Sequence, residues 1–295
     1  MFKMEFKSKL IAAAAVGFSI VAQAQSPVSG FMTPAGKVSV SLSYSSENYD
    51  NVFLVPKKVE GVPIFKKVEN TAYNLYVTYG SSDKINLIFS LPYITSKGNA
   101  DQVVLNDLGL ENERKGIQDG SLFIKFKPFS KKMGNATLDL LGTVGITAPL
   151  GGYNANEGFQ SIIAIGNAST KVTTLGIAQL KMDNGLFATA QLGYSIRNNR
   201  VPNAFVSELK LGYAGSKIYV DAYAAIQQSG TGNDILQPGF DAFFPATRVN
   251  YGRLGVNVYV PIASGFGVSG GFNTYISGRN LGQSTGFSAG LVKNF

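Results

Sequence analysis

The sequence predicts an all-β fold, an antiparallel transmembrane β-barrel of about twelve strands of the outer-membrane type. Three observations lead to this prediction. Many segments alternate between apolar and small or polar side chains, the connections between them are short and long in turn, and the carboxyl-terminal segment alternates up to Phe295. In a membrane barrel, one face of each strand meets lipid and the other faces the interior, so the side chains repeat with a period of two.

The amino-terminal 24 residues have the layout of a signal peptide. Lys3, Lys7 and Lys9 precede an apolar run at positions 10–21, and Ala22-Gln23-Ala24 provides the small residues that signal peptidase accepts. The run is shorter than the roughly 20 residues that a membrane helix needs. We therefore expect cleavage after Ala24 and export to the outer membrane of a Gram-negative bacterium. Residues 25–36 are interpreted as a short periplasmic lead-in, too brief to be a plug, and residues 37–295 as the barrel.

The expected strands follow in order, and most have the roughly 9 to 11 residues that cross a membrane at a tilt. They are 37–46, 71–80, 85–93, 120–129, 136–150, 171–182, 186–196, 205–213, 217–227, 247–260, 266–277 and 284–295. The first is the most regular, because Val38, Val40, Leu42 and Tyr44 alternate with serines. Segment 171–182 is the least regular, since both of its faces mix apolar and polar residues. Two alternatives remain open, in which 171–182 is not a strand or 159–168 is an additional one.

The connections between these segments distinguish a barrel from a soluble β-sandwich. Short links at 81–84, 130–135, 183–185, 214–216 and 261–265 alternate with long ones at 47–70, 94–119, 151–170 and 228–246. Outer-membrane barrels have short periplasmic turns and longer extracellular loops, whereas a sandwich does not sort its loops in this way. Backbone groups exposed to lipid cost several kcal/mol each, so a sheet in the membrane must close.

The last segment also contains a residue that tests the assignment of faces. Lys293 falls on the same face as Phe287, Leu291 and Phe295. A lysine facing lipid costs about 2 to 4 kcal/mol at the bilayer midplane but about 0 to 1 near an interface. Because Lys293 is only two residues before Phe295, a position at the periplasmic interface is compatible with its charge. The barrel-assembly machinery is the expected partner of this strand.

The composition excludes several kinds of chemistry. The chain has no Cys, His or Trp, which removes thiolate and imidazole metal sites and any histidine-activated nucleophile. We therefore expect no cofactor, no metal site and no enzymatic activity, with a carboxylate pair such as Asp139 and Asp221 as the remaining catalytic alternative. The formal charge is +8, and the predicted signal peptide carries two of these charges, which leaves +6. The basic residues are scattered, so outer-membrane lipid and lipopolysaccharide are expected partners rather than nucleic acid.

Three motifs resemble a known family. They are DKINL with LPY at 83–87 and 91–93, GIQD at 116–119, and PLGGY at 149–153. Over residues 71–194 the chain is similar to the family known as the MetA-pathway of phenol degradation, which groups outer-membrane transporters. Gln118 and Leu150 depart from the family patterns Gly-Leu-Gly-Asp and Pro-Thr-Gly. The resemblance implies a barrel linked to uptake of aromatic or other hydrophobic compounds, and no binding residue is carried over from it.

The alternation places a set of charged and aromatic side chains on the inner face. The predicted lumen-lining residues are Lys125, Lys127, Asp139, Arg197, Glu208, Lys210, Tyr219, Asp221, Tyr223 and Arg253. In an open lumen, five positive and three negative charges predict a weak anion preference. Alternatively, the charges pair across the lumen and fill it. Tyr219 and Tyr223, with Phe123 and Tyr275, are interpreted as packing inside a narrow lumen in preference to a path for an apolar solute.

These observations predict a channel or transporter for passive passage of small molecules, with apolar or aromatic solutes implied by the family resemblance alone. The alternative is a closed structural or adhesive barrel without transport. The first long loop, with Lys57, Lys58, Lys66 and Lys67, is interpreted as a solvated basic loop, and the second as a mobile surface segment.

Overall fold

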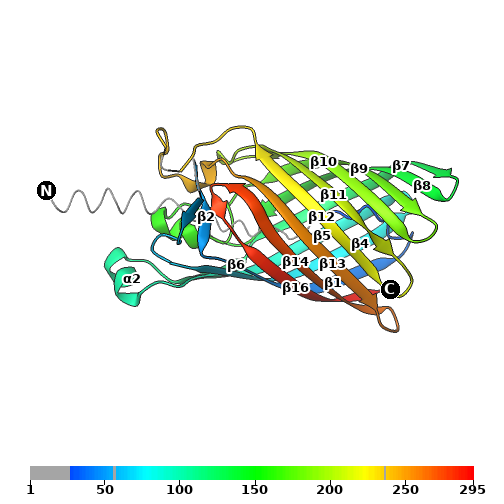
Figure 1. The fold of residues 1–295 in the computed structure, drawn as a ribbon, viewed down its shortest axis with the longest axis horizontal. Helices are drawn as coiled ribbons and strands as arrows, with labels where there is room; N and C mark the ends of the chain where they lie inside the picture. Colours follow the sequence, from blue (N-terminus) through cyan, green and yellow to red (C-terminus); the bar gives the residue numbers. More distant parts are fainter. Residues whose placement is uncertain (1–26, 56–57, 236) are drawn as a thin grey trace.

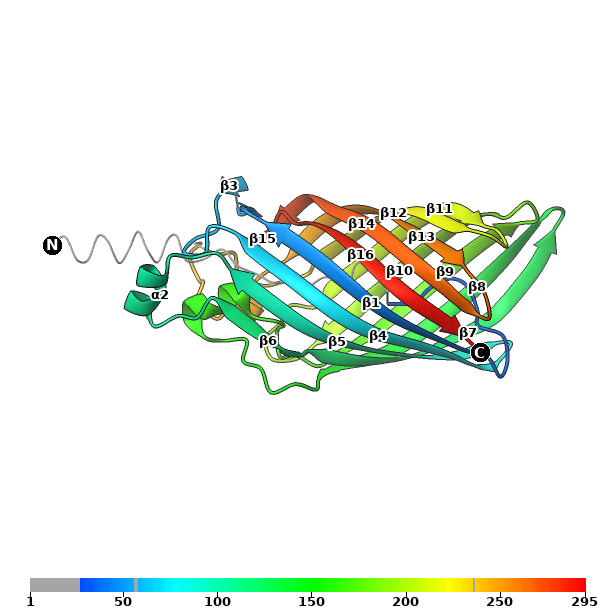
Figure 2. The same cartoon turned by 90° about the horizontal axis from the view of Figure 1, so that it is seen from below.

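The protein forms a closed antiparallel β-barrel (Figures 1 and 2). The structure is a computed structural model that describes residues 27–55, 58–235 and 237–295. The predicted signal peptide, Gln25 and Lys57 lie outside the described residues. Twelve long strands build the wall, which confirms the predicted fold class. They are β1 (Val38–Tyr49), β4 (Val68–Ser82), β5 (Ile85–Gly98), β7 (Asp119–Met133), β8 (Ala136–Pro149), β9 (Lys171–Met182), β10 (Leu186–Arg197), β11 (Ala204–Ala214), β12 (Tyr219–Ser229), β13 (Asn250–Pro261), β14 (Phe266–Arg279) and β16 (Thr285–Asn294).

Sequence neighbours pair around the barrel, and the first and last strands close it. Leu42 of β1 lies opposite both Leu291 of β16 and Leu75 of β4. The irregular segment 171–182 is strand β9, paired on both sides. The alternative strand at 159–168 is not present, because Gly158–Ile163 forms the 3₁₀ helix η1. The short strand β6 (Glu113–Ile117) continues the edge of β7 along β5.

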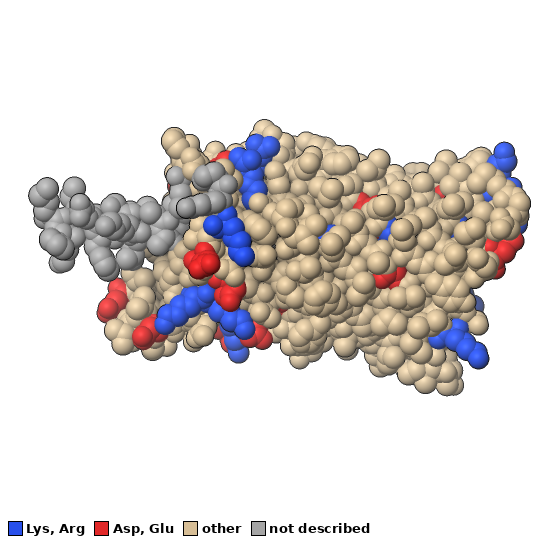
Figure 3. Space-filling view, viewed as in Figure 1, with Lys and Arg blue, Asp and Glu red and all other residues tan. Residues whose placement is uncertain are grey.

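The two faces of the wall differ as the alternation predicts. Leu209 is 53% exposed on the outside, whereas the next residue, Lys210, is 9% exposed inside. Figure 3 shows Lys, Arg, Asp and Glu gathered at the two ends of the barrel, with a band between them that is almost free of charge. A band of this kind suits the hydrocarbon core of a bilayer.

One end of the barrel carries the short turns and the carboxyl terminus (Figure 1), and we assign it to the periplasm. Gly185 has a φ of 91° in the turn between β9 and β10, a conformation that glycine adopts without steric cost. Lys293 donates a hydrogen bond from Nζ to the carbonyl oxygen of Ser264 at 2.6 Å and lies over the rings of Phe266 and Phe295. Its ammonium group is therefore held at the rim, as the pattern predicts.

The long connections fold together at the opposite end. They include the small sheet of β2 (Asn51–Phe53), β3 (Lys58–Glu60) and β15 (Leu281–Gly282), the helix α2 (Gln102–Leu108), η1, and the 3₁₀ helix η2 (Phe244–Ala246). No helix in the described residues is long and apolar enough to cross a membrane. The first three loops share an apolar cluster of Tyr49, Val52, Val62, Phe65, Val68, Leu105, Ile162 and Ile163. The lysines at 58, 66 and 67 are exposed, whereas Val62 and Phe65 among them are buried in this cluster.

Candidate functional site: the barrel lumen

Residues 27–34 lie along the inside of the barrel. Gly36 pairs with Gly80 at the periplasmic end, and the side chain of Asn86 exchanges two hydrogen bonds of 2.8 Å with the backbone of Thr33. Val28, 1% exposed, packs in an apolar cluster with Ile88, Phe123, Leu141, Leu175 and Ile177. The interpretation of 25–36 as a periplasmic lead-in too short to be a plug does not hold for residues 27–34. A single extended segment is enough to fill much of a twelve-stranded lumen, because inward side chains already narrow it.

Lys125 holds this lumen segment, which we define as residues 27–34. Its ammonium group donates hydrogen bonds to the carbonyl oxygens of Ser29, at 2.9 Å, and Phe31, at 2.5 Å. Lys125 is 1% exposed and forms no ion pair within the described residues. The amide of Gln191 adds a hydrogen bond to the carbonyl oxygen of Val28. The charge of Lys125 is therefore compensated by backbone dipoles of the lumen segment.

Most of the other predicted inward charges pair along the wall. Lys181 lies 2.6 Å from Asp139, and Lys210 lies 3.5 Å from Glu208 and 3.8 Å from Asp221. Tyr219 donates a hydrogen bond to Asp221 and stacks on Phe187 with ring centroids 5.4 Å apart. Lys127 is half-buried near the periplasmic end, beside the register shift between Phe126 and Phe129. The partners in each ion pair belong to the same or adjacent strands, so the ion pairs do not cross the lumen.

Arg253 lies among aromatic rings. Its guanidinium carbon is 5.4 Å from the ring centroid of Tyr275 and 6.0 Å from that of Tyr223. Both phenol oxygens accept hydrogen bonds from its terminal nitrogens, at 3.5 and 3.2 Å. All three side chains are at most 5% exposed. Tyr275 therefore packs around a buried cation.

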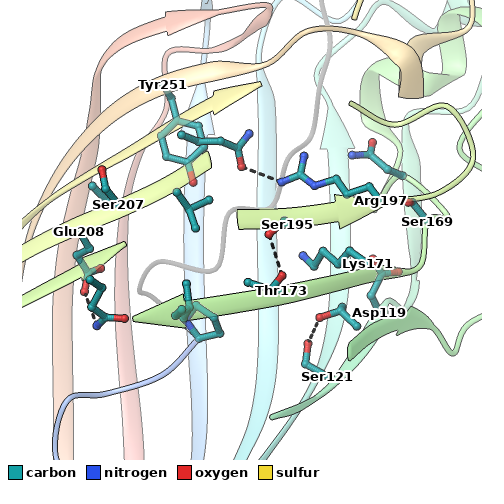
Figure 4. A pocket seen from close by; sticks show the side chains of 18 of the residues that line it. Asp119, Ser121, Ser169, Lys171, Thr173, Ser195, Arg197, Ser207, Glu208 and Tyr251 are labelled. Carbon is teal, nitrogen blue, oxygen red and sulfur yellow. Dashed lines mark hydrogen bonds between the residues drawn. The ribbon is translucent and has the colours of Figure 1, made fainter. Parts of the chain in front are cut away.

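A cavity of about 230 Å³ lies inside the barrel on the outer side of the lumen segment, with Pro27 at its boundary (Figure 4). Arg197, Glu208, Tyr223 and Arg253 line it, and they are the predicted residues that the fold brings together there. Lys125, Lys127, Asp139, Lys210, Tyr219 and Asp221 do not line it.

Two charged residues of this cavity were not among the predicted lumen set. Asp119 begins β7 and Lys171 begins β9. Lys171 was not predicted because both faces of 171–182 mix apolar and polar residues, so the inward face of β9 could not be identified. The register between β9 and β10 places Lys171 opposite the inward Arg197 and identifies that face. Apolar side chains, among them Phe123, Leu175 and Val206, complete the lining. The cavity can therefore hold a small molecule that has both charged and apolar parts.

A closed barrel with an apolar outer band and a lumen lined by polar groups defines the protein as an outer-membrane β-barrel. No protein-family model matches the chain, and no curated protein matches it in sequence. Its fold is similar to that of the COG4313 outer membrane channel from Pseudomonas putida F1, with a TM-score of 0.72 and 15% identity over 92% of this chain and 100% of that chain.

Weaker similarities extend to barrels of other functions. The translocator domain of autotransporter NalP from Neisseria meningitidis has a TM-score of 0.46 and 12% identity, over 99% of this chain and 96% of that chain. Outer membrane phospholipase A from Escherichia coli has a TM-score of 0.42 and 9% identity, over 96% of each chain. At this level of similarity neither one bears on function.

Proposed function

We propose that the protein is an outer-membrane channel or transporter that allows passive passage of small molecules, without catalysis. The observation that carries this proposal is the cavity inside the barrel, which adjoins a segment held to the wall by a few side chains. The neighbour of the same fold is described as an outer membrane channel. The resemblance to the MetA-pathway of phenol degradation family favours apolar or aromatic solutes. Export by the signal peptide at 1–24, insertion through the strand ending at Phe295 and contact with lipopolysaccharide belong to the same proposal.

Passage requires the lumen segment to move. A solute entering from the outer end would occupy the cavity and reach the periplasm when residues 27–34 leave the wall. The contacts that hold the segment include the two hydrogen bonds from Lys125, those from Gln191, Asn86 and Tyr76, and the packing of Val28 and Phe31. The barrel itself is held by twelve paired strands, so the segment can move at a much lower free energy than unfolding.

The alternative is a closed structural or adhesive barrel. The observation in its favour is that both ends are filled, the periplasmic end by the lumen segment and the outer end by the shared apolar cluster of the first three loops. A protein of this kind would use its loops at the cell surface and would pass no solute.

Conductance in planar bilayers separates the two functions. We expect discrete current steps from the refolded protein, altered by Lys125→Ala through the lumen segment and by Arg253→Ala through the cavity. Reversal potentials should show a weak anion preference, since Lys171, Arg197 and Arg253 outnumber Asp119 and Glu208 in the cavity. A silent protein that migrates as a folded barrel on a gel would contradict the channel, and a cation preference would contradict the charge assignment.

A further inference from the structure

We infer that Lys171 and Arg197 form a binding site for the carboxylate group of a small apolar monocarboxylate, held in the cavity of the lumen. This inference rests on the proposed function in that it names the class of solute. The binding step itself can be measured apart from passage.

The two cations are placed directly opposite each other. Lys171 is the first residue of β9 and Arg197 is the last residue of β10, and they are register partners in the antiparallel ladder. Figure 4 shows both side chains pointing into the pocket. Directly opposed residues have Cβ atoms about 4.5 to 5.5 Å apart, and like charges at this spacing destabilise a sheet. An anion bound between them would relieve that repulsion.

Neither cation has an ionic partner among the residues that the structure describes. Arg197 donates to two neutral acceptors, the carbonyl oxygen of Pro202 at 3.3 Å and the side chain of Gln227 at 3.0 Å. Its Nε is buried without a hydrogen-bond partner. Lys171 makes no ion pair, although its ammonium group has a longer-range electrostatic attraction to the carboxylate of Asp119. The pair therefore retains donors for a ligand.

The other charges around the cavity are already engaged. Asp119 accepts a hydrogen bond from the hydroxyl group of Tyr153, and Glu208 lies 3.5 Å from the ammonium group of Lys210. Arg253 is held by the hydroxyl groups of Tyr223 and Tyr275. Two cations facing one carboxylate, that of Asp119, leave one uncompensated positive charge, which matches a monoanion.

The rest of the cavity limits the size and polarity of the ligand. Phe123, Leu175 and Val206 supply an apolar wall. Thr173 and Ser195, which lie near the cations, hydrogen-bond to each other at 2.8 Å. The volume of about 230 Å³ is below the range of about 300 to 1,000 Å³ for drug-sized ligands. A molecule the size of benzoate, with one carboxylate and an apolar body, meets both conditions.

The test is a binding titration with the folded barrel in phosphatidylcholine nanodiscs. Isothermal titration calorimetry with benzoate, neutral benzamide and cationic benzylamine compares the same ring with three charges. We expect benzoate to bind at least about tenfold more tightly than benzamide, and benzylamine not to bind. Lys171→Gln and Arg197→Gln should each weaken benzoate about tenfold or more and leave benzamide unchanged, since one of two ionic contacts is lost. Lys127→Gln, outside the cavity, should change neither.

Three results would overturn the inference: benzoate binding no tighter than benzamide binding, failure of all three probes to bind, or unchanged benzoate affinity in both variants. The comparison of probes on the unaltered protein stands even if a variant does not fold, which heat-modifiable migration on a gel would reveal. A barrel that binds benzoate but is silent in bilayers would overturn the channel function and leave the site. A conducting barrel that does not favour benzoate would overturn the site alone.

Discussion

Replacing Lys125 with methionine should release the lumen segment. The substitution keeps an unbranched side chain of similar reach but removes both hydrogen bonds to the carbonyl oxygens of Ser29 and Phe31. A hydrogen bond to a charged group contributes about 1.5 to 3 kcal/mol. Lys125 regains water when the segment leaves, so the low end applies, or about 3 kcal/mol for the two bonds. At about 1.4 kcal/mol per factor of ten, the open fraction should rise roughly a hundredfold.

Single-channel recording measures this fraction as the share of time spent at the open level. Lys127→Met is the matched control, because Lys127 is on the same strand but makes no hydrogen bond to the lumen segment within the described residues. We expect frequent openings of Lys125→Met and unchanged recordings of the control. If deletion of residues 27–34 opens the barrel while Lys125→Met behaves as the unaltered protein, this lysine does not hold the segment.

Three further predictions concern the segment, a loop and the wall. A Cβ at Gly30 would lie 1.9 Å from Oε1 of Gln179, which is fully buried, so Gly30→Ala should displace the segment. The displacement should raise maleimide labelling of a Val28→Cys reporter, because Val28 is 1% exposed, and equal labelling would contradict the close contact. In the outer loop, hydrogen bonds from Arg279 lower the pKa of Asp234 below 3.8. A lowered carboxyl pKa contributes stability that is complete above the unfolded-state value and is lost as the pH falls through the folded-state value. The hydrogen-exchange protection factors of residues 230–235 and 237–248 should therefore stay high down to about pH 4 and fall below it, whereas in Asp234→Asn they should be low throughout; a fall that begins near pH 6 would contradict the assignment. On the lipid face, Leu209→Lys should lower the free energy of unfolding in bilayers by about 2 to 4 kcal/mol, and a change under 1 kcal/mol would place Leu209 outside the hydrocarbon region.

The alternation of side chains predicts the wall of the barrel because the bilayer imposes it. Each strand must present apolar groups to lipid, so Leu42, Leu209 and Leu291 could be assigned from the period of two alone. The extra length of β4 and β5 beyond the expected 71–80 and 85–93 was not predicted, because their outer ends pair above the apolar band with ordinary polar residues such as Ser96.

The interior could not be predicted to the same extent. The sequence places Lys125 on the inner face, but nothing in its neighbourhood predicts that its partners are backbone carbonyl groups almost 100 positions earlier in the chain. Lumen contacts depend on which strands face each other across a closed barrel, and a period of two carries no such information. Lys171 was missed for a different reason, because both faces of 171–182 mix apolar and polar residues and the period of two does not show which face of β9 is inward, whereas its register partner Arg197 was found.

Control of passage by the lumen segment can be tested by liposome swelling with the unaltered barrel and with a variant that lacks residues 27–34. We expect slow entry of small neutral solutes into liposomes that carry the unaltered barrel and clearly faster entry with the shortened one, because the segment that fills the lumen is gone. Equal rates from two correctly folded barrels would contradict this expectation. In that case the lumen segment would not control passage, and a closed structural barrel would be the better description if both rates matched those of empty liposomes.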